Sequence, residues 1–457
     1  MHFNFLGKEN SVAKPGFNRW RITPAALSIH LCIGQIYACS VFNKPMTQLI
    51  GITASAPEDW DLRTIGWIFS IALFCLGASA AILGKWVERV GPRKAMFASA
   101  SCFASGFFLA AIGVHFHNIW IIYFGQGLLG GIGLGLGYIS PVSTLIKWFP
   151  DKPGMATGMA IMGFGGGAII ASPLSVWLMR LFRNDFSVGV EEAFLIMGAI
   201  YFLVMMFGVI TIRVPYKNWL PDNFKGLEIK KRKLITSSNV LADQAIKTPQ
   251  FYLLFGVLML NVTAGIGVLG QASVMIQEMF SVTSVGIERS IDEKSAAGFV
   301  MLLSLFNMAG RFIWSSLSDW IGRKNTYAVF FILGTILYVL LPTLGRTGNI
   351  VIFMAALCII ISMYGGGFAT IPAYLKDLFG SIQVGAIHGR LLLAWSAAAL
   401  LGPVLINYIR YYQIEVRHIP KADAYSFSLY IMAGLLVIGM LLNYLIKPVD
   451  KKFDIQQ

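Results

Sequence analysis

Apolar runs longer than about 18 residues recur along the whole chain and are separated by polar segments. A run of this length crosses a hydrocarbon core about 30 Å thick as an α-helix, whereas strands of a membrane barrel need only about ten residues of alternating polarity. Charged residues make up 13% of the chain, which is about half their share in soluble proteins. The sequence therefore predicts an all-α polytopic membrane protein.

Hydropathy predicts twelve transmembrane helices, with approximate bounds at residues 22–42, 64–84, 95–114, 119–142, 155–180, 193–213, 250–277, 296–317, 326–344, 350–374, 385–409 and 425–446. Lysine and arginine concentrate in the segments on one side of this arrangement, so the positive-inside rule places both termini in the cytoplasm. We expect the protein in the cell inner membrane. The formal net charge of +14 reflects the same clustering, and we expect no nucleic-acid partner.

Short motifs recur in the two halves of the chain. Three pairs of residues are separated by nearly the same number of positions, namely Glu88 and Asp319, Gly154 and Gly385, and Pro173 and Pro403. This predicts two parallel six-helix repeats, residues 1–213 and 249–457, joined by a cytoplasmic linker at residues 214–248. The basic cluster at 230–233 in that linker should face anionic lipid. A substrate site is expected between the halves, near the midplane.

Arg311 lies inside the predicted span 296–317, about 10–12 Å from its polar end. A guanidinium at that depth costs several kcal/mol unless it faces a polar cavity, where it can hold a carboxylate by two parallel hydrogen bonds. Asn307 lies one turn earlier and can orient the guanidinium or bind the substrate. The alternative is a structural arginine bonded to backbone carbonyls or extended toward the cytoplasm. One fixed cation suits a monocarboxylate, because a dianion would keep an uncompensated charge.

Other polar side chains in the predicted spans can donate hydrogen bonds to a substrate or can link neighbouring helices. These candidates are Gln35, Tyr37, Gln126, Tyr138 and Tyr364. His30 is the candidate for carrying a proton, with a satisfied interior histidine as the alternative. No carboxylate lies clearly in mid-membrane, so three routes stay open: a proton on His30, a proton travelling with the substrate, or anion exchange.

Metal and enzyme chemistry are disfavoured. The five cysteines lie in apolar runs without metal-ligand spacing, and the apolar spans show no nucleophile–base pair or catalytic acid. We therefore expect no metal, no cofactor and no enzymatic activity. The glycine-rich run 130–137 lies inside an apolar span, where it indicates close helix packing rather than phosphate binding.

Residues 84–94 resemble the signature between helices two and three of the major facilitator superfamily, with Glu88 where aspartate is more usual. Residues 318–324 resemble a second copy. Residues 25–42 and 307–311 are similar to the oxalate/formate antiporter family, which is related to the monocarboxylate transporters. The resemblance implies a major facilitator fold. It also implies that Asn307 and Arg311 stand where monocarboxylate transporters carry an Asp-x-x-x-Arg pair.

The oxalate-exchanging branch of that family pairs its helix-eight arginine with a lysine in helix eleven, whereas residues 391–402 here contain no lysine. We therefore predict secondary transport of a small monocarboxylate such as lactate or pyruvate by alternating access, with oxalate/formate-type exchange as the alternative. The partners are the carboxylate anion, protons if transport is coupled to them, and membrane lipid. We expect a monomer.

Charged residues gather at the cytoplasmic ends of the second and eighth predicted helices. They are Glu88, Arg89, Arg93, Asp319 and Arg323. We interpret them as charge locks between the two bundles, which hold the cytoplasmic side shut in the outward-open state.

Overall fold

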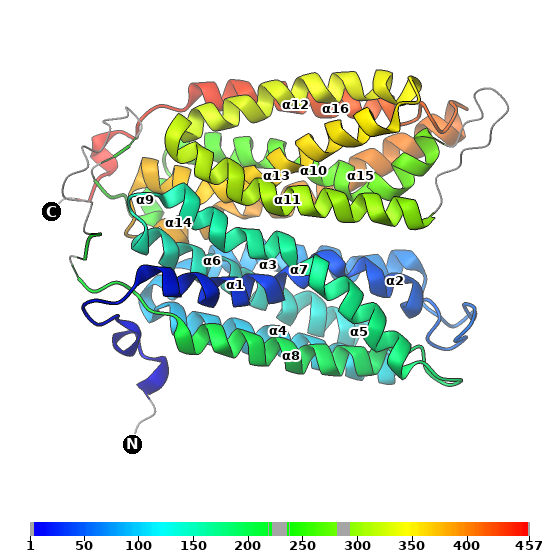
Figure 1. The fold of residues 1–457 in the computed structure, drawn as a ribbon, viewed down its shortest axis with the longest axis horizontal. Coiled ribbons are helices and arrows are strands. Elements are labelled where there is room, and N and C mark those ends of the chain that lie inside the picture. Colours follow the sequence, from blue (N-terminus) through cyan, green and yellow to red (C-terminus); the bar gives the residue numbers. More distant parts are fainter. Residues whose placement is uncertain (1–3, 218, 222–234, 237, 281–292, 456–457) are drawn as a thin grey trace.

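The computed structural model describes residues 4–217, 219–221, 235–236, 238–280 and 293–455, and these residues are almost entirely helical (Figure 1). Within the described residues, eleven helices are long and apolar enough to cross a membrane, and the count is twelve if a bent pair near the N-terminus forms one span. The all-α, twelve-helix prediction is confirmed. The basic cluster at 230–233 lies outside the described residues.

Six spans make up the N-terminal half. They are α1 (Ile22–Ile33) with α2 (Ser40–Met46), α3 (Leu62–Val90), α4 (Pro92–His115), α5 (Ile119–Ile122) with α6 (Gly131–Trp148), α7 (Pro153–Phe182) and α8 (Val190–Thr211). The C-terminal half begins after the short helix α9 (Ala242–Ala245). Its spans are α10 (Pro249–Met279), α11 (Glu293–Ile321), α12 (Arg323–Arg346), α13 (Ile350–Phe379), α14 (Val384–Leu391) with α15 (Leu393–Tyr411), and α16 (Ser426–Leu445).

The first span is bent rather than continuous. A 3-10 segment, Gly34–Ala38, separates α1 from α2, and the two parts meet at 45°. Gly34 lies against α7 at the bend, where an added Cβ would come 2.4 Å from the Phe164 carbonyl oxygen. The fourth span contains a π-helical segment, Tyr123–Gly130, between α5 and α6. Hydropathy locates spans but does not detect such local changes of helix type.

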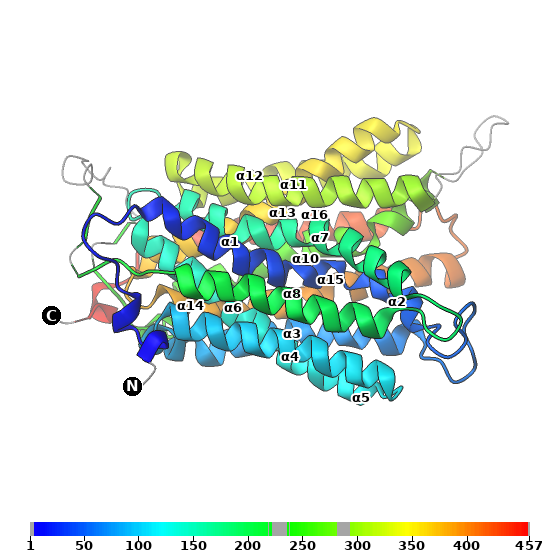
Figure 2. The ribbon, with the colours of Figure 1, turned by 60° about the horizontal axis from the view of Figure 1, so that its bottom comes forward.

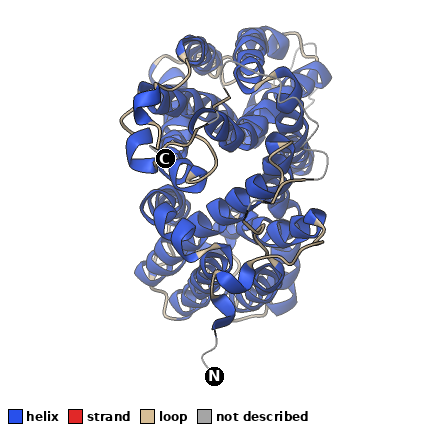
Figure 3. Cartoon of the chain, turned by 90° about the vertical axis from the view of Figure 1, so that its left-hand side faces the viewer, coloured by secondary structure: helices blue, strands red, loops and turns tan. Residues whose placement is uncertain are grey.

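The helices form two bundles that lie side by side. Helices α1–α8 pack among themselves, as do α10–α16, and Figures 1 to 3 show the two groups from three directions. The bundles meet where α11 packs on α7 and where α14 and α15 pack on α3. Both termini lie at the same end of the bundles, which is also the end that carries α9. The site described below lies on the α7–α11 contact.

Gly158 and Gly389, which are separated by the same 231 positions as Gly154 and Gly385, lie where the bundles touch. A Cβ on Gly158 would come 2.1 Å from the Ser315 hydroxyl oxygen in α11. A Cβ on Gly389 would come equally close, 2.1 Å, to the Ala80 carbonyl oxygen in α3. Only glycine allows helix backbones to approach this closely. The repeat in the sequence therefore corresponds to two equivalent helix crossings.

Alternating glycines let α6 pack between two neighbouring helices. Gly131 and Gly135 lie against α3, where added Cβ atoms would come 2.7 and 2.5 Å from the carbonyl oxygens of Ala72 and Leu76. Gly133 faces the other neighbour, α4, and its added Cβ would come 2.7 Å from the Phe103 amide nitrogen. The helix-packing interpretation of residues 130–137 agrees with these contacts.

Candidate functional site

Arg311 is completely buried between α11, α7 and α13. Its Nε donates to Asn307 Oδ1 at 3.1 Å, one turn earlier in the same helix. Its Nη1 donates to the Ile161 carbonyl oxygen of α7 at 3.4 Å, which is a long contact. Its Nη2 is buried and has no partner among the described residues. The guanidinium is therefore oriented by Asn307 but keeps a free donor edge.

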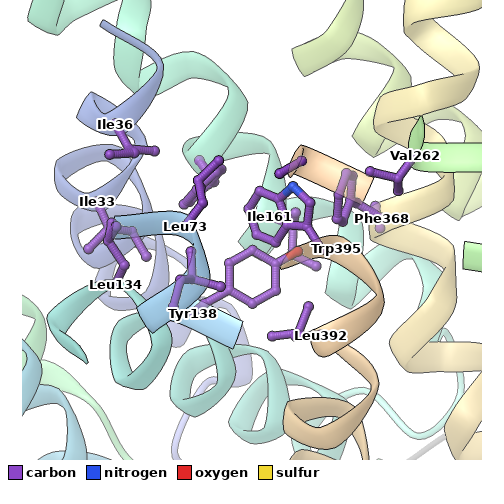
Figure 4. Close-up of a cluster of buried hydrophobic side chains, with 14 of the residues drawn as sticks. Ile33, Ile36, Leu73, Leu134, Tyr138, Ile161, Val262, Phe368, Leu392 and Trp395 are labelled. Atoms are coloured by element: carbon purple, nitrogen blue, oxygen red, sulfur yellow. The ribbon is translucent and has the colours of Figure 1, made fainter. Parts of the chain in front are cut away.

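Aromatic rings from both halves surround the guanidinium. Its central carbon lies 5.5 Å from the Phe164 ring centre and 5.4 Å from the Phe368 ring centre, within the range of cation–π attraction. Trp395 packs against both rings, with centroid distances of 5.5 and 4.6 Å. Figure 4 shows Tyr138 and Phe368 on either side of the Trp395 indole. We call Arg311 together with Phe164, Phe368 and Trp395 the aromatic chamber.

Three predicted tyrosines contact the aromatic chamber. Tyr138 packs on Phe164 and Trp395 at 5.4 and 5.7 Å, Tyr37 packs on Phe164 at 5.1 Å, and Tyr364 packs on Phe368 at 5.3 Å. The hydroxyl groups of all three are buried without a hydrogen-bond partner among the described residues, and so is the Trp395 Nε1.

A buried donor without a partner costs about 1–3 kcal/mol. Four such donors lie here in addition to the free Nη2 of Arg311. The five groups come from five different spans. An acceptor-rich group such as a carboxylate would satisfy several of them at once. The arrangement can therefore bind a small anion.

A cavity of about 450 Å³ leads to this region from the end of the bundles opposite the termini. It reaches Asn307, Tyr37 and Gly165 on the inner side, and Asn43 and Gly66 on the outer side. The cavity lining includes no charged residue among the described residues. A small polar solute can thus reach Asn307 and Gly165, which lie against Arg311, from one end of the molecule.

Two acidic residues join the bundles at the end that carries the termini, which we call the closed end. Asp319 of α11 accepts hydrogen bonds at 2.9 Å from the amides of Gly154 and Met155, which begin α7 in the other half. Glu88 of α3 accepts a hydrogen bond at 3.3 Å from the amide of Gly385, which lies at the start of α14. Each carboxylate thus caps a helix of the opposite bundle, where the helix dipole favours negative charge.

The other predicted charge-lock residues differ in position. Arg323 pairs with Asp319 and also with Asp377 at 3.3 Å, so it belongs to this closed end. Arg93 donates to the carbonyl oxygens of Phe5 and Ile212 within the N-terminal half. Arg89 is exposed and has no ion pair to the described residues. Neither Arg89 nor Arg93 therefore bridges the two bundles in this conformation.

Gln35 and Gln126 do not face the cavity that leads to Arg311. Both line a small space inside the N-terminal bundle, beside Phe103 and Phe107, rather than the cavity that leads to Arg311. Gln35 Nε2 lies 3.8 Å from the Cys39 sulfur. Their polarity indicated a site, but in this conformation the structure places them within one bundle.

Three aromatic residues of the chamber were not among the predicted site residues. Phe164, Phe368 and Trp395 look like ordinary packing residues in a chain rich in phenylalanine. A usable signal was the triple glycine that follows Phe164, since an added Cβ on Gly165 would come 3.2 Å from the Arg311 Nε. Among the described residues, no group of three or more histidine, cysteine, aspartate or glutamate side chains is placed to hold a metal ion.

Comparisons with known proteins agree with the fold. The model of the Major Facilitator Superfamily matches residues 29–403. The oxalate:formate antiporter of Oxalobacter formigenes is 27% identical over 84% of this chain and 83% of its own length. The uncharacterized MFS-type transporter YhjX of Escherichia coli is 25% identical over 84% and 86%. The apicoplast pyruvate carrier 1 of Toxoplasma gondii is 22% identical over 74% and 68%.

Solved structures share this architecture at low sequence identity. The transporter FucP in an outward conformation superposes with a TM-score of 0.63 at 12% identity, covering 92% of this chain and 98% of its own. The proton:xylose symporter XylE gives 0.64 at 15% identity, covering 93% and 95%. Because the family model covers most of the chain and solved members share its fold, the protein belongs to the major facilitator superfamily and is a transporter rather than an enzyme.

Proposed function

We propose that this protein is a secondary carrier that moves a small monocarboxylate, such as lactate or pyruvate, across the inner membrane by alternating access. The observation that carries the proposal is the buried Arg311, whose Nη2 is free and lies among unpartnered hydroxyl and indole donors. A carboxylate bound there would replace its lost hydration with charge-assisted hydrogen bonds. Asn307 would keep the guanidinium in position.

The number of cations at the site favours a substrate with a single negative charge. Arg311 is the one fixed cation among the described residues of the chamber and the cavity. A dicarboxylate would bring a second negative charge into a poorly solvated space without a partner. In α15 the one basic residue is Arg410, and it pairs with Glu278 rather than with a ligand.

The open and closed ends support alternating access. The cavity reaches Asn307, Tyr37 and Gly165, beside the chamber, from one end. At the other end, Asp319 and Glu88 join the two bundles. With both termini in the cytoplasm, as we propose, this conformation is outward-open. The carrier would work as a monomer, with its basic linker on anionic lipid.

The alternative is exchange of oxalate for formate or of related small carboxylates. The oxalate:formate antiporter among the relatives favours it, and the pyruvate carrier favours a monocarboxylate. The missing second cation in α15 leads us to prefer the monocarboxylate.

Proteoliposomes would test the proposal. Uptake of labelled lactate, pyruvate, formate and oxalate should be measured with and without a proton gradient, together with counterflow. We expect saturable uptake and counterflow of lactate or pyruvate, loss of both in Arg311→Gln, and weak competition by oxalate. Oxalate that competes as strongly as lactate would refute the charge argument, and transport without saturation would point to a channel.

A further inference from the structure

Two buried histidines from opposite halves flank Tyr138. The ring of His30, from α1, lies 5.6 Å from the Tyr138 ring, and the ring of His388, from α14, lies 5.8 Å from it on centroid distances. His30 is 0% exposed and His388 is 1% exposed. The Nε2 atom of each has no hydrogen-bond partner among the described residues, and the same is true of the Tyr138 hydroxyl. Each of the three neighbouring rings thus carries a buried polar atom without a hydrogen-bond partner among the described residues.

One hydrogen bond of His30 shows which of its two ring nitrogens carries the hydrogen. Its Nδ1 lies 3.1 Å from the Ala26 carbonyl oxygen, which can only accept, so the ring hydrogen is on Nδ1. In a neutral ring Nε2 is then the unprotonated atom with an available lone pair. Protonating it would require no change in the bond to Ala26. A proton that binds to His30 therefore adds at Nε2.

The charges around the pair are few. The titratable or charged groups facing His30 are Tyr138 from α6, Arg311 from α11 and His388 from α14. Those facing His388 are Tyr138 and His30. From α3, which packs along α14, Ala80 approaches Gly389, and Glu88 binds the amide at the start of α14.

The other charged side chain on α14 binds residues of α9 rather than the histidines. Arg390, on the same helix, binds Asp243 and the carbonyl oxygen of Ala242 in α9. No described carboxylate contacts either histidine.

Arg311 links this pair to the anion site. Gly163 of α7 lies against His30, and Gly165, two residues later, lies against Arg311. The Arg311 charge therefore acts on the His30 ring. Without a substrate, the guanidinium charge opposes a second positive charge on a nearby imidazole. A carboxylate on Arg311 cancels that charge and removes the opposition. Binding of an anion and binding of a proton therefore favour each other.

We propose that His30, Tyr138 and His388 form a proton-binding site that fills when Arg311 binds a carboxylate, so that one proton moves with each monocarboxylate. The proton adds to the Nε2 lone pair of one histidine from the solution on the loading side. It leaves again when the anion dissociates on the other side. The inference rests on the proposed function and adds the coupling ion and the residues that carry it.

The pH dependence of binding tests the inference. Dissociation constants of lactate and pyruvate should be measured on purified protein between pH 6 and 8, with proton uptake from a weakly buffered solution followed in parallel. Uptake of one proton predicts that the dissociation constant rises about tenfold for each unit of pH. We expect this slope to vanish in the double variant His30→Gln, His388→Gln, while binding still depends on Arg311. His115→Gln, an exposed histidine beside Glu191, is the matched control and should keep the slope.

The outcomes separate this inference from the proposed function. Arg311-dependent binding without a pH slope or proton uptake in the parent would overturn the inference and leave the carrier proposal standing. A slope that persists in the double variant would place the proton elsewhere, for example on the acid itself, and would also overturn it. Failure of both acids to bind would overturn both proposals. If the double variant does not fold, the single variants His30→Gln and His388→Gln decide: the slope should vanish in at least one of them, and its persistence in both would overturn the inference.

Discussion

Arg311 carries a permanent charge into the contact between the two halves, and its surroundings satisfy it only in part. Asn307 and the Ile161 carbonyl oxygen accept two of its donors, while Phe164 and Phe368 offer ring faces. A fully structural arginine would be expected to use all its donors, because each unsatisfied buried donor costs about 1–3 kcal/mol. The free edge is what a ligand would complete.

Substitution of Arg311 tests this view. Arg311→Lys should lose most transport although the charge is kept, because an ammonium cannot reproduce the planar two-point contact. Arg311→Gln should lose essentially all of it. Loss of a charge-assisted bidentate contact costs roughly 2–5 kcal/mol, or about 30-fold or more in affinity. Lactate and pyruvate binding should be measured on variants of confirmed monodispersity, and parent-like affinity in Arg311→Gln would make the arginine structural.

A second cation should change the preferred substrate charge. Ala398 is buried in α15, one turn after Trp395 of the aromatic chamber. Ala398→Lys should strengthen oxalate binding relative to lactate binding, since the added ammonium can neutralise the second carboxylate. Competition of unlabelled oxalate against labelled lactate measures the ratio. Ala398→Met, of similar length but uncharged, is the control and should not shift it.

At the scale of elements, the sequence determines most of the architecture. Apolar length and the positive loops located the spans because burial in lipid depends on composition. The recurring glycines predicted the repeats because both bundles need the same close crossings, as Gly158 and Gly389 show. The bend at Gly34–Ala38 was not predictable, since it depends on how closely α7 approaches.

The sequence indicates which buried polar residues are unusual, but it does not indicate which neighbouring helix each of them faces. Membrane depth singled out Arg311, and helix spacing added Asn307, because a buried charge is rare enough to be informative. Hydropathy does not reveal which side of a helix faces which neighbour, so Gln35 and Gln126 were grouped with Tyr138 although they face the N-terminal bundle. The roles of all these residues stay predictions.

Helix packing in α6 gives a prediction at this scale. Gly135→Ala would place a Cβ 2.5 Å from the Leu76 carbonyl oxygen, and the backbone of α3 cannot yield easily. We expect a loss of about 1–3 kcal/mol, seen as a lower unfolding temperature of the purified protein. Gly434→Ala in α16 is the matched control, because nothing lies within 4 Å of its added Cβ. That change should be neutral or stabilising by about 0.5–1 kcal/mol, and equal effects of the two would contradict the packing argument.

At the scale of the whole molecule, contacts at the end that carries the termini hold the halves together. Asp243 of α9 binds Lys85 of α3 and Arg390 of α14, so a segment between the halves joins both. The hydrogen bonds from Lys85 and Arg390 lower the pKa of Asp243 to about 2. A lowered pKa means that this contribution is present above about pH 4 and is lost as the pH falls toward 2.

Asp243→Asn should therefore loosen the closed end by the same amount at pH 6 and at pH 8. Accessibility of a cysteine introduced at Ala386, which packs against Gly84 across the bundles, measures the loosening from the terminal side. The expected effect is small because Asp243 is exposed. An effect that differs between these two pH values would mean that another group titrates at this contact.

Removing the cap on α7 should shift the whole carrier. Asp319→Asn keeps an acceptor oxygen for Gly154 or Met155 but removes the charge that Arg323 and the helix start stabilise. Such a loss is worth about 1–3 kcal/mol, enough to move a nearly balanced equilibrium toward the state that is open at the end carrying the termini. Cys39 lines the cavity, so its labelling by an impermeant maleimide from the end opposite the termini should slow in Asp319→Asn once the other cysteines are replaced. Asp450→Asn, which removes an exposed pair with Lys452, is the control and should not change the rate. Unchanged labelling in Asp319→Asn would mean that the cap only shapes the loop and does not hold the carrier closed.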